Sequence, residues 1–300
     1  MEQVQDRPRR RVPASADALQ LLSAAYTPTA TRFRPEDSPF SVLFADVTHR
    51  CNMACANCYI PVRTLPDLPA DWLYDVLARL PRRTRIRLVG AEPTVREDLP
   101  ELIANVRRLG HTPVVLSNGL KLGRRAYVDQ LKAAGLRTLH LSMNGGLRDD
   151  LYEILDGMPC AARKLKALDN LIDARMNVTV GAILVPDVTD EHFPEFLEYA
   201  LGRGVRDFHF RSVGAMGNHM QGRPYDLAGL EAQLRGALGA RATDLEVLSA
   251  EGSSLDLRLG RVTIQLTQWP DLGSLERGRI APDGHVEAMF ESIQANEFHY

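Results

Sequence analysis

Cysteine is scarce in this sequence, and its placement is more informative than its number. Four cysteines occur among 300 residues, and Cys51, Cys55 and Cys58 lie within one eight-residue segment. This spacing is too tight for a disulfide framework and is typical of metal ligation in a reducing compartment. We therefore expect a cytoplasmic protein in which these three cysteines bind a metal.

Long apolar runs and an excess of charge of one sign are also lacking. No stretch approaches the roughly 20 apolar residues that cross a bilayer, and residues 1–40 lack the apolar core of a secretory signal. The formal net charge of -2 leaves no general basic footprint for nucleic acid, although Arg9, Arg10 and Arg11 form a short basic run. We interpret that run as a solvated tail and expect neither a membrane nor a nucleic acid as a partner.

Short apolar runs alternate with amphipathic segments, which is the pattern of repeated β/α units that build a parallel sheet. Strands are expected at residues 41–48, 85–90, 112–118, 137–144, 177–185 and 207–213. Apolar residues at three- and four-residue spacing mark helices between them, as in the stripe of Leu99, Leu102, Ile103 and Val106. Six units joined by right-handed crossovers predict an α/β fold, a partial (β/α)6 TIM-like barrel with its active site at the carboxyl ends of the strands.

The predicted domain organisation has three parts. Residues 1–40 contain five prolines and one candidate helix, at residues 16–26, and we expect an N-terminal arm. Residues 41–213 form the partial barrel. In residues 214–300 the alternation of strand and helix segments ends, and we expect a C-terminal cap that extends the substrate site.

The three clustered cysteines follow directly after the first predicted strand, so they belong to a loop at the catalytic end of the barrel. Thiolates are the usual ligands of iron-sulfur clusters, and a cubane has four irons whereas this loop offers three sulfurs. One iron is therefore left open to bind a further molecule. The alternative is a closed zinc centre with His49 as a fourth ligand, but His49 lies only two residues before Cys51. A non-enzymatic iron-sulfur or zinc binding module is the rival class.

The spacing of Cys51, Cys55 and Cys58 resembles, without gaps, the CxxxCxxC signature of the radical S-adenosylmethionine (SAM) superfamily. This resemblance implies a 4Fe-4S cluster held by the three cysteines, with SAM chelating the open iron through its methionyl amine and carboxylate. It also implies that Tyr59, the aromatic residue after the third cysteine, packs near the adenine.

A second segment, at the end of the second predicted strand, looks like the GGEP segment of the same family. The segment reads Gly90, Ala91, Glu92 and Pro93, and the alanine is a small departure from the family pattern. The resemblance implies that its backbone and Glu92 hold the methionyl ammonium. Taken alone, such a segment is ordinary turn chemistry.

Polar residues also follow later strands, where the resemblance implies contacts with the ribose and carboxylate of SAM. They are Ser117, Asn118, Ser142, Asn144 and Arg211. Each of them is also compatible with a turn or a helix cap. The segment Val180 to Val185 is expected to flank the adenine. The implied chemistry is reductive cleavage of SAM by an external one-electron reductant such as flavodoxin or ferredoxin, and hydrogen abstraction by a 5'-deoxyadenosyl radical.

The last third of the chain contains no cysteine, which argues against auxiliary clusters. A short single-cluster enzyme resembles the antibiotic-pathway sugar epimerases, of the kind that turns neomycin C into neomycin B. A small-molecule substrate such as a cationic aminosugar needs carboxylates around it. Candidates for that role are Asp46, Asp149, Asp150, Glu153, Glu287 and Glu291, although any one of them is more simply a surface charge.

An epimerase also needs a hydrogen donor on the opposite face of the sugar, and a thiol is the usual one. Cys160 is the free cysteine, although a small buried core cysteine is the commoner outcome. Ser249 marks a second candidate position, if a cysteine stands there natively; an ordinary loop serine is the simpler interpretation. Peptide modification, dehydrogenation or carbon-carbon chemistry on another small metabolite are the alternative reactions.

Overall fold

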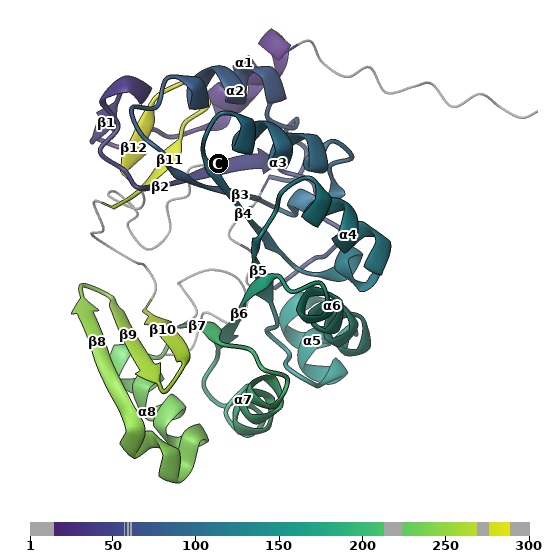
Figure 1. The fold of residues 1–300 in the computed structure, drawn as a ribbon, viewed down its shortest axis with the longest axis vertical. Coiled ribbons are helices and arrows are strands. Elements are labelled where there is room, and N and C mark those ends of the chain that lie inside the picture. Colours follow the sequence, from purple (N-terminus) through teal and green to yellow (C-terminus); the bar gives the residue numbers. More distant parts are fainter. Residues whose placement is uncertain are drawn as a thin grey trace, which may run out of the picture.

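The sheet of this protein is curved and continuous, and helices cover its outer face (Figure 1). The computed structural model describes residues 15–56, 58, 60, 62–212, 224–268 and 276–288. Within these ranges, twelve strands hydrogen-bond in the order β1-β12-β11-β2-β3-β4-β5-β6-β7-β10-β9-β8. The structure confirms the α/β class and the partial barrel.

Six neighbouring parallel strands form the centre of the sheet, and each coincides with one of the six predicted from the sequence. They are β2 (Val42–Thr48), β3 (Arg85–Gly90), β4 (Thr112–Ser117), β5 (Thr138–Ser142), β6 (Asn177–Leu184) and β7 (Asp207–Ser212). Because all six run in the same direction, their carboxyl ends meet at one edge of the barrel.

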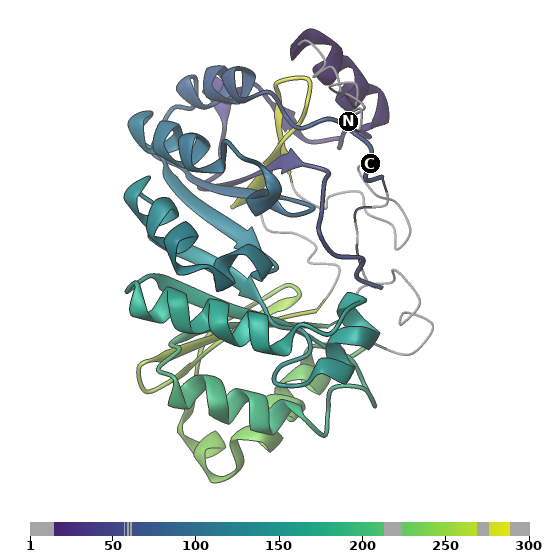
Figure 2. The ribbon, with the colours of Figure 1, turned by 90° about the vertical axis from the view of Figure 1, so that its right-hand side faces the viewer.

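Helices follow these strands and pack on the outer face. They are α2 (Ala70–Ala78), α3 (Leu99–Arg108), α4 (Arg125–Ala133), α5 (Asp149–Asp156), α6 (Ala161–Asp173) and α7 (Phe193–Gly202). Figure 2 shows α2, α3, α4, α6 and α7 stacked along one side of the sheet. The predicted stripe of Leu99, Leu102, Ile103 and Val106 is fully buried in the core between sheet and helices. None of the helices in the described ranges is long and apolar enough to span a membrane.

Residues outside the predicted barrel extend both edges of the same sheet. On one side, β11 (Arg277–Ile280) pairs with β2. β12 (Val286–Ala288) pairs with β11, and β1 (Arg32–Phe33) pairs with β12 at the edge of the sheet. On the other side, β10 (Val262–Thr267) pairs with β7, followed by β9 (Ser254–Leu259) and β8 (Leu245–Glu251). The helices of these flanking parts are α1 (Ser15–Ala25) and α8 (Leu227–Leu238).

The parts expected as an arm and a cap are therefore joined to the barrel through backbone hydrogen bonds. The domain boundaries at residues 40 and 213 remain a prediction, because a shared sheet does not separate one unit from the next.

Candidate active site

The loop after β2 carries the three clustered cysteines at the carboxyl edge of the sheet. All three thiols are free and only partly exposed. The backbone N–H of Met53 donates to Cys51 Sγ and that of Ile60 donates to Cys58 Sγ, each at 3.4 Å. Arg63 Nη2 lies 2.7 Å from Cys58 Sγ. Such donors are typical of sulfurs that carry negative charge, as cluster-bound thiolates do.

Three thiols without a fourth protein ligand are the donor set of an iron-sulfur cubane that leaves one iron open. Among the described residues, no three His, Cys, Asp or Glu side chains converge on one ion, and this includes the closed zinc centre with His49. Burial raises the pKa of the Cys55 thiol, so the positive charge of bound iron is needed to hold it as a thiolate.

The turn after β3 is built against this loop, and its first residue has to be glycine. Gly90 has a φ of +112°, and a Cβ added there would lie 2.2 Å from the Thr48 carbonyl oxygen. The N–H of Ala91 donates to Thr48 O at 2.8 Å, and the N–H of Glu92 donates to Arg50 O at 3.1 Å. The segment Gly90 to Pro93 is therefore docked on the first residues of the cysteine loop.

The Glu92 carboxylate links the ends of β3 and β4. It is 1% exposed and accepts hydrogen bonds from Thr94 N at 3.0 Å, Thr94 Oγ1 at 2.5 Å, Ser117 Oγ at 2.9 Å and Asn118 N at 2.6 Å. Burial raises the pKa of Glu92, and these hydrogen bonds oppose the rise. Both carboxylate oxygens of Glu92 thus accept hydrogen bonds from the chain itself. In this structure Glu92 positions the backbone and hydroxyl groups around it.

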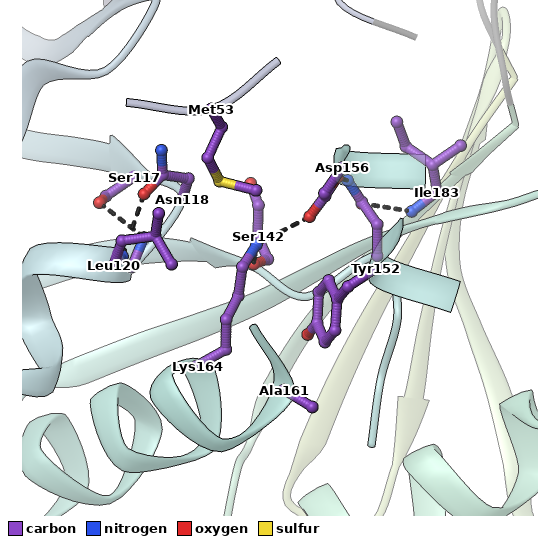
Figure 3. Close-up of polar contacts among 12 residues, drawn as sticks. Met53, Ser117, Asn118, Leu120, Ser142, Tyr152, Asp156, Ala161, Lys164 and Ile183 are labelled. Carbon is purple, nitrogen blue, oxygen red and sulfur yellow. Dashed lines mark hydrogen bonds and ion pairs between the residues drawn. The ribbon is translucent and has the colours of Figure 1, made fainter. Parts of the chain in front are cut away.

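Asn118 connects the end of β4 to the cysteine loop. Its Nδ2 donates to Asn52 Oδ1 at 2.8 Å and lies 3.9 Å from Cys51 Sγ, while its Oδ1 accepts from Leu120 N at 3.0 Å. Ser117 beside it is buried and accepts from Gly119 N. Figure 3 shows Ser117, Asn118 and Leu120 below Met53 of the loop. The structure thus brings Asn118 to the cysteine loop and joins Ser117 to Glu92.

A buried ion pair, which could not be predicted from the sequence, lies next to this network. Lys164 of α6 and Asp156 of α5 are excluded from solvent, with Lys164 Nζ 2.9 Å from Asp156 Oδ2 and 3.0 Å from the Ser142 carbonyl oxygen. Nζ also lies 4.8 Å from the centre of the Tyr152 ring. The pair therefore fixes the end of β5 to both helices (Figure 3).

Asn144 joins the predicted β5 site to the same pair. Its Nδ2 donates to Asp156 Oδ1 at 2.8 Å, and its Oδ1 accepts from Ile183 N of β6 at 3.2 Å. Ser142 contributes its carbonyl oxygen, as described above. Within the segment Val180 to Val185, Val180, Ala182 and Leu184 are buried in the core while Ile183 lies on the opposite face.

Cys160 packs behind the cysteine loop. It is 3% exposed and shares a small apolar cluster with Met53, Leu120 and Tyr152, against which Cys51 and Cys55 are packed. Burial raises the pKa of its thiol. Cys160 is therefore brought close to the predicted cluster, although it is enclosed rather than open to solvent.

The turn between α5 and α6 supports the loop from the same side. Gly157 approaches the loop closely, because a Cβ there would lie 2.6 Å from Ala54 O. The N–H of Ala56 donates to Leu155 O at 3.1 Å. The loop thus has backbone contacts with α5, as well as with the turn after β3.

A comparison with protein-family models identifies the family of this chain. The model of the Radical SAM superfamily matches residues 46–200, which is just over half of the chain and includes the three cysteines and every element from β3 to α6. The chain belongs to the radical SAM superfamily. Membership identifies its cofactors as a 4Fe-4S cluster, for which Cys51, Cys55 and Cys58 are the fitting ligands, and SAM.

Individual radical SAM relatives match only part of the chain. It is 31% identical over 183 residues to the 7,8-dihydro-6-hydroxymethylpterin dimethyltransferase of Methanocaldococcus jannaschii, covering 57% of this chain and 36% of that protein. It is 27% identical over 191 residues to the GTP 3',8-cyclase of Brucella abortus, covering 60% of this chain and 54% of that protein. This chain thus spans about a third to a half of the length of these relatives.

The fold extends beyond the matched sequence. The crystal structure of Streptococcus suis SuiB bound to S-adenosylmethionine superposes with a TM-score of 0.64 at 15% identity, covering 88% of this chain and 63% of that one. At this identity the likeness shows the fold alone. It agrees with the partial barrel.

Several residues that were predicted to belong to the site lie away from the cysteine loop or outside the described residues of this radical SAM chain. Tyr59 and Glu291 lie outside the described residues. Ser249 lies on β8, at the sheet edge away from the cysteine loop, and its hydroxyl donates to Asp256 Oδ2 at 3.0 Å. Arg211 lies on β7, opposite Ile183 of β6. The catalytic and SAM-binding roles expected from the sequence stay predictions.

Proposed function

We propose that this radical SAM chain abstracts hydrogen from a small substrate that carries an anionic group, bound at the inner face of the sheet. When bound, the cluster and SAM supply the 5'-deoxyadenosyl radical that takes the hydrogen atom. The chain's own residues bind the substrate, orient its target carbon and keep water away. The observation that carries the proposal is the row of basic side chains on the inner face, the face that α2 to α7 leave uncovered.

Alternation along the strands places these side chains. Ile86 and Leu88 of β3 are buried in the core beneath the helices, so Arg85 and Arg87 lie on the opposite, inner face. The same reasoning assigns to this face His140 of β5, His209 and Arg211 of β7, and Arg277 of β11. The guanidinium of Arg87 lies 5.1 Å from the centre of the Phe44 ring of β2.

Electrostatics at the inner face agree with this placement. Burial, together with the charges of Arg87 and Arg211, lowers the pKa of His140 to about 3. Burial and the charge of Arg211 also hold the pKa of His209 well below its ordinary value. Both imidazoles are thus neutral at physiological pH, and the arginines supply the positive charge that attracts an anion.

The carboxylates expected to bind a cationic aminosugar are mostly engaged by the chain itself. Asp46 pairs with Arg279, and Glu287 pairs with Arg32 and accepts from Tyr26. The exposed carboxylate of Asp150 pairs with Arg148. We infer an anionic substrate, rather than a cationic one, from the sign of the charge that Arg85, Arg87 and Arg211 bring to the inner face. The name of the GTP 3',8-cyclase relative, which specifies an anionic nucleotide, supports the same class.

The proposal is tested by the substrate dependence of SAM cleavage. Reconstituted protein with dithionite is offered separate pools of nucleotides, sugar phosphates, aminoglycosides and peptides, and 5'-deoxyadenosine is measured. We expect stimulation by an anionic pool, lost in Arg87→Gln and kept in Arg108→Gln, a matched change at the exposed end of α3. Stimulation by the aminoglycoside or peptide pools alone would reject the anionic class.

Epimerisation of an aminoglycoside-type sugar is a second candidate reaction, favoured by the position of Cys160 beside the cysteine loop. In deuterated water, an epimerase that uses this thiol gives a product with deuterium at the inverted carbon. Cys160→Ala then keeps formation of 5'-deoxyadenosine but blocks inversion, whereas Ser249→Cys changes nothing. A product lighter by two hydrogens would instead identify a dehydrogenase.

A further inference from the structure

An open concavity of about 530 Å³ lies between the turn after β4 and the first half of α6. The turn is the short helix η3 (Leu120–Gly123), which packs directly on α6. The concavity is lined by Leu120, Lys121, Gly123, Arg124, Ala162, Arg163 and Lys166. Four of these seven residues are basic, and none is acidic.

The four basic side chains of this concavity have no acidic partner in the described part of the chain, where ion pairs are otherwise common. Nearby, Arg125 of α4 pairs with Asp129, and Lys164 of α6 pairs with Asp156. Neither Lys121, Arg124, Arg163 nor Lys166 takes part in an ion pair with any described residue. The partial positive charge at the start of α6 adds to the same field. The concavity therefore presents uncompensated positive charge.

The floor of the concavity is in contact with the cysteine loop. Leu120 lines the concavity and also packs in the cluster with Met53, against which Cys51 and Cys55 rest. Its N–H donates to Asn118 Oδ1, and Asn118 Nδ2 lies 3.9 Å from Cys51 Sγ. A partner seated in the concavity is thus separated from the thiols by the layer of Leu120 and Asn118.

We propose that this concavity is the docking surface for a small acidic electron-carrier protein that reduces the cluster. The inference rests on the proposed function, because a radical SAM cluster needs one electron for each SAM that it cleaves. In the step, the reduced carrier loses one electron and the cluster gains it, and no bond in the protein changes. Positive charge beside the thiols raises the rate of encounter with an acidic partner and fixes its orientation.

The test compares a charge-reversed variant with a matched control. Arg163→Glu/Lys166→Glu removes the basic charge of α6 at exposed positions, and Arg108→Glu/Arg206→Glu makes the same charge change at the opposite end of the strands. Reduction of the reconstituted cluster is followed by stopped-flow absorbance with an acidic flavodoxin, an acidic ferredoxin, or dithionite as the reductant. Binding of each carrier to the cluster-free protein is measured by calorimetry.

We expect the α6 variant to be reduced at least about tenfold more slowly by a carrier than the control variant at low salt, with the difference lost at high salt. Its reduction by dithionite and its thermal melting temperature should match the control. Equal carrier rates and affinities in the two variants would overturn the proposal, as would tight binding of inorganic pyrophosphate with no effect on either carrier. Failure of dithionite to support SAM cleavage by the unmodified protein would instead reject the proposed function.

Discussion

The ammonium of Lys164 lies 2.9 Å from Oδ2 of Asp156, and the two side chains are 0% and 1% exposed. Lys164 Nζ also donates to the Ser142 carbonyl oxygen, and Asp156 Oδ1 accepts from the Asn144 amide. The pair joins α5, α6 and the ends of β5 and β6 directly behind the cysteine loop. A buried pair of this kind is costly to break from one side, because the remaining charge is left without a partner.

Lys164→Met is therefore expected to lower the free energy of unfolding by about 3–5 kcal/mol, measured by urea denaturation of the cluster-free protein. Lys164→Met/Asp156→Leu should recover part of this loss, since no charge is then left buried. Arg148→Met removes one side of the exposed pair with Asp150 and serves as the control, with little expected change. A loss for Lys164→Met no larger than that of the control would contradict the assigned role of the pair.

Glu92→Ala is expected to weaken SAM binding while leaving the iron content near normal. The structure gives the reason, because the variant leaves Thr94 Oγ1 and Ser117 Oγ as buried donors, and Asn118 N as a part-buried donor, without their acceptor. The variant should also melt at a lower temperature. Isothermal titration with SAM and an iron assay measure the two effects, and Glu97→Ala at the exposed end of the same turn is the control. Unchanged SAM affinity would remove Glu92 from the site.

Stability is expected to fall as the pH decreases below about 6.5. The folded-state pKa values of His140 and His209 lie below the ordinary value, so the unfolded chain binds more protons than the folded chain in this range. The stability that the two neutral histidines contribute is complete above the pKa of histidine in the unfolded chain. It is lost progressively as the pH falls from there toward their pKa values in the folded chain. Each histidine contributes at most about 1.4 kcal/mol per pH unit.

Urea unfolding at pH 7.5, 6.5 and 5.5 measures this slope. His140→Gln should flatten it, and His192→Gln, on the outer side at the start of α7, should not. A slope that His140→Gln leaves unchanged would show that this imidazole is not held neutral at the inner face.

Features that repeat along the chain could be predicted from the sequence. The strands from β2 to β7 are short segments in which apolar residues are continuous or alternate with polar ones, and helices with apolar stripes such as that of α3 lie between them, so the period and order of these segments predicted the barrel. The cysteine loop and the turn at Gly90 were found because their residue types are rare and their spacing is specific. Local pattern is sufficient for such features.

Features that depend on distant partners could not be predicted. Nothing local distinguishes Lys164 from Lys166, yet one is fully buried against Asp156 and the other lines the exposed basic concavity. Likewise, Asp46 was expected to face a substrate, but its partner Arg279 comes from β11, which joins the sheet from far along the chain. Pairing across the sheet, rather than sequence pattern, decides which charges remain available.

The central claim is that the loop after β2 holds a redox-active cluster that cleaves SAM. The most direct measurement reconstitutes the protein anaerobically, counts its metals, and then assays 5'-deoxyadenosine after reduction in the presence of SAM. The account predicts a brown protein with about four irons per chain that forms 5'-deoxyadenosine, and a variant with Cys51, Cys55 and Cys58 changed to alanine that has neither property. A colourless protein with stoichiometric zinc and no 5'-deoxyadenosine would contradict it.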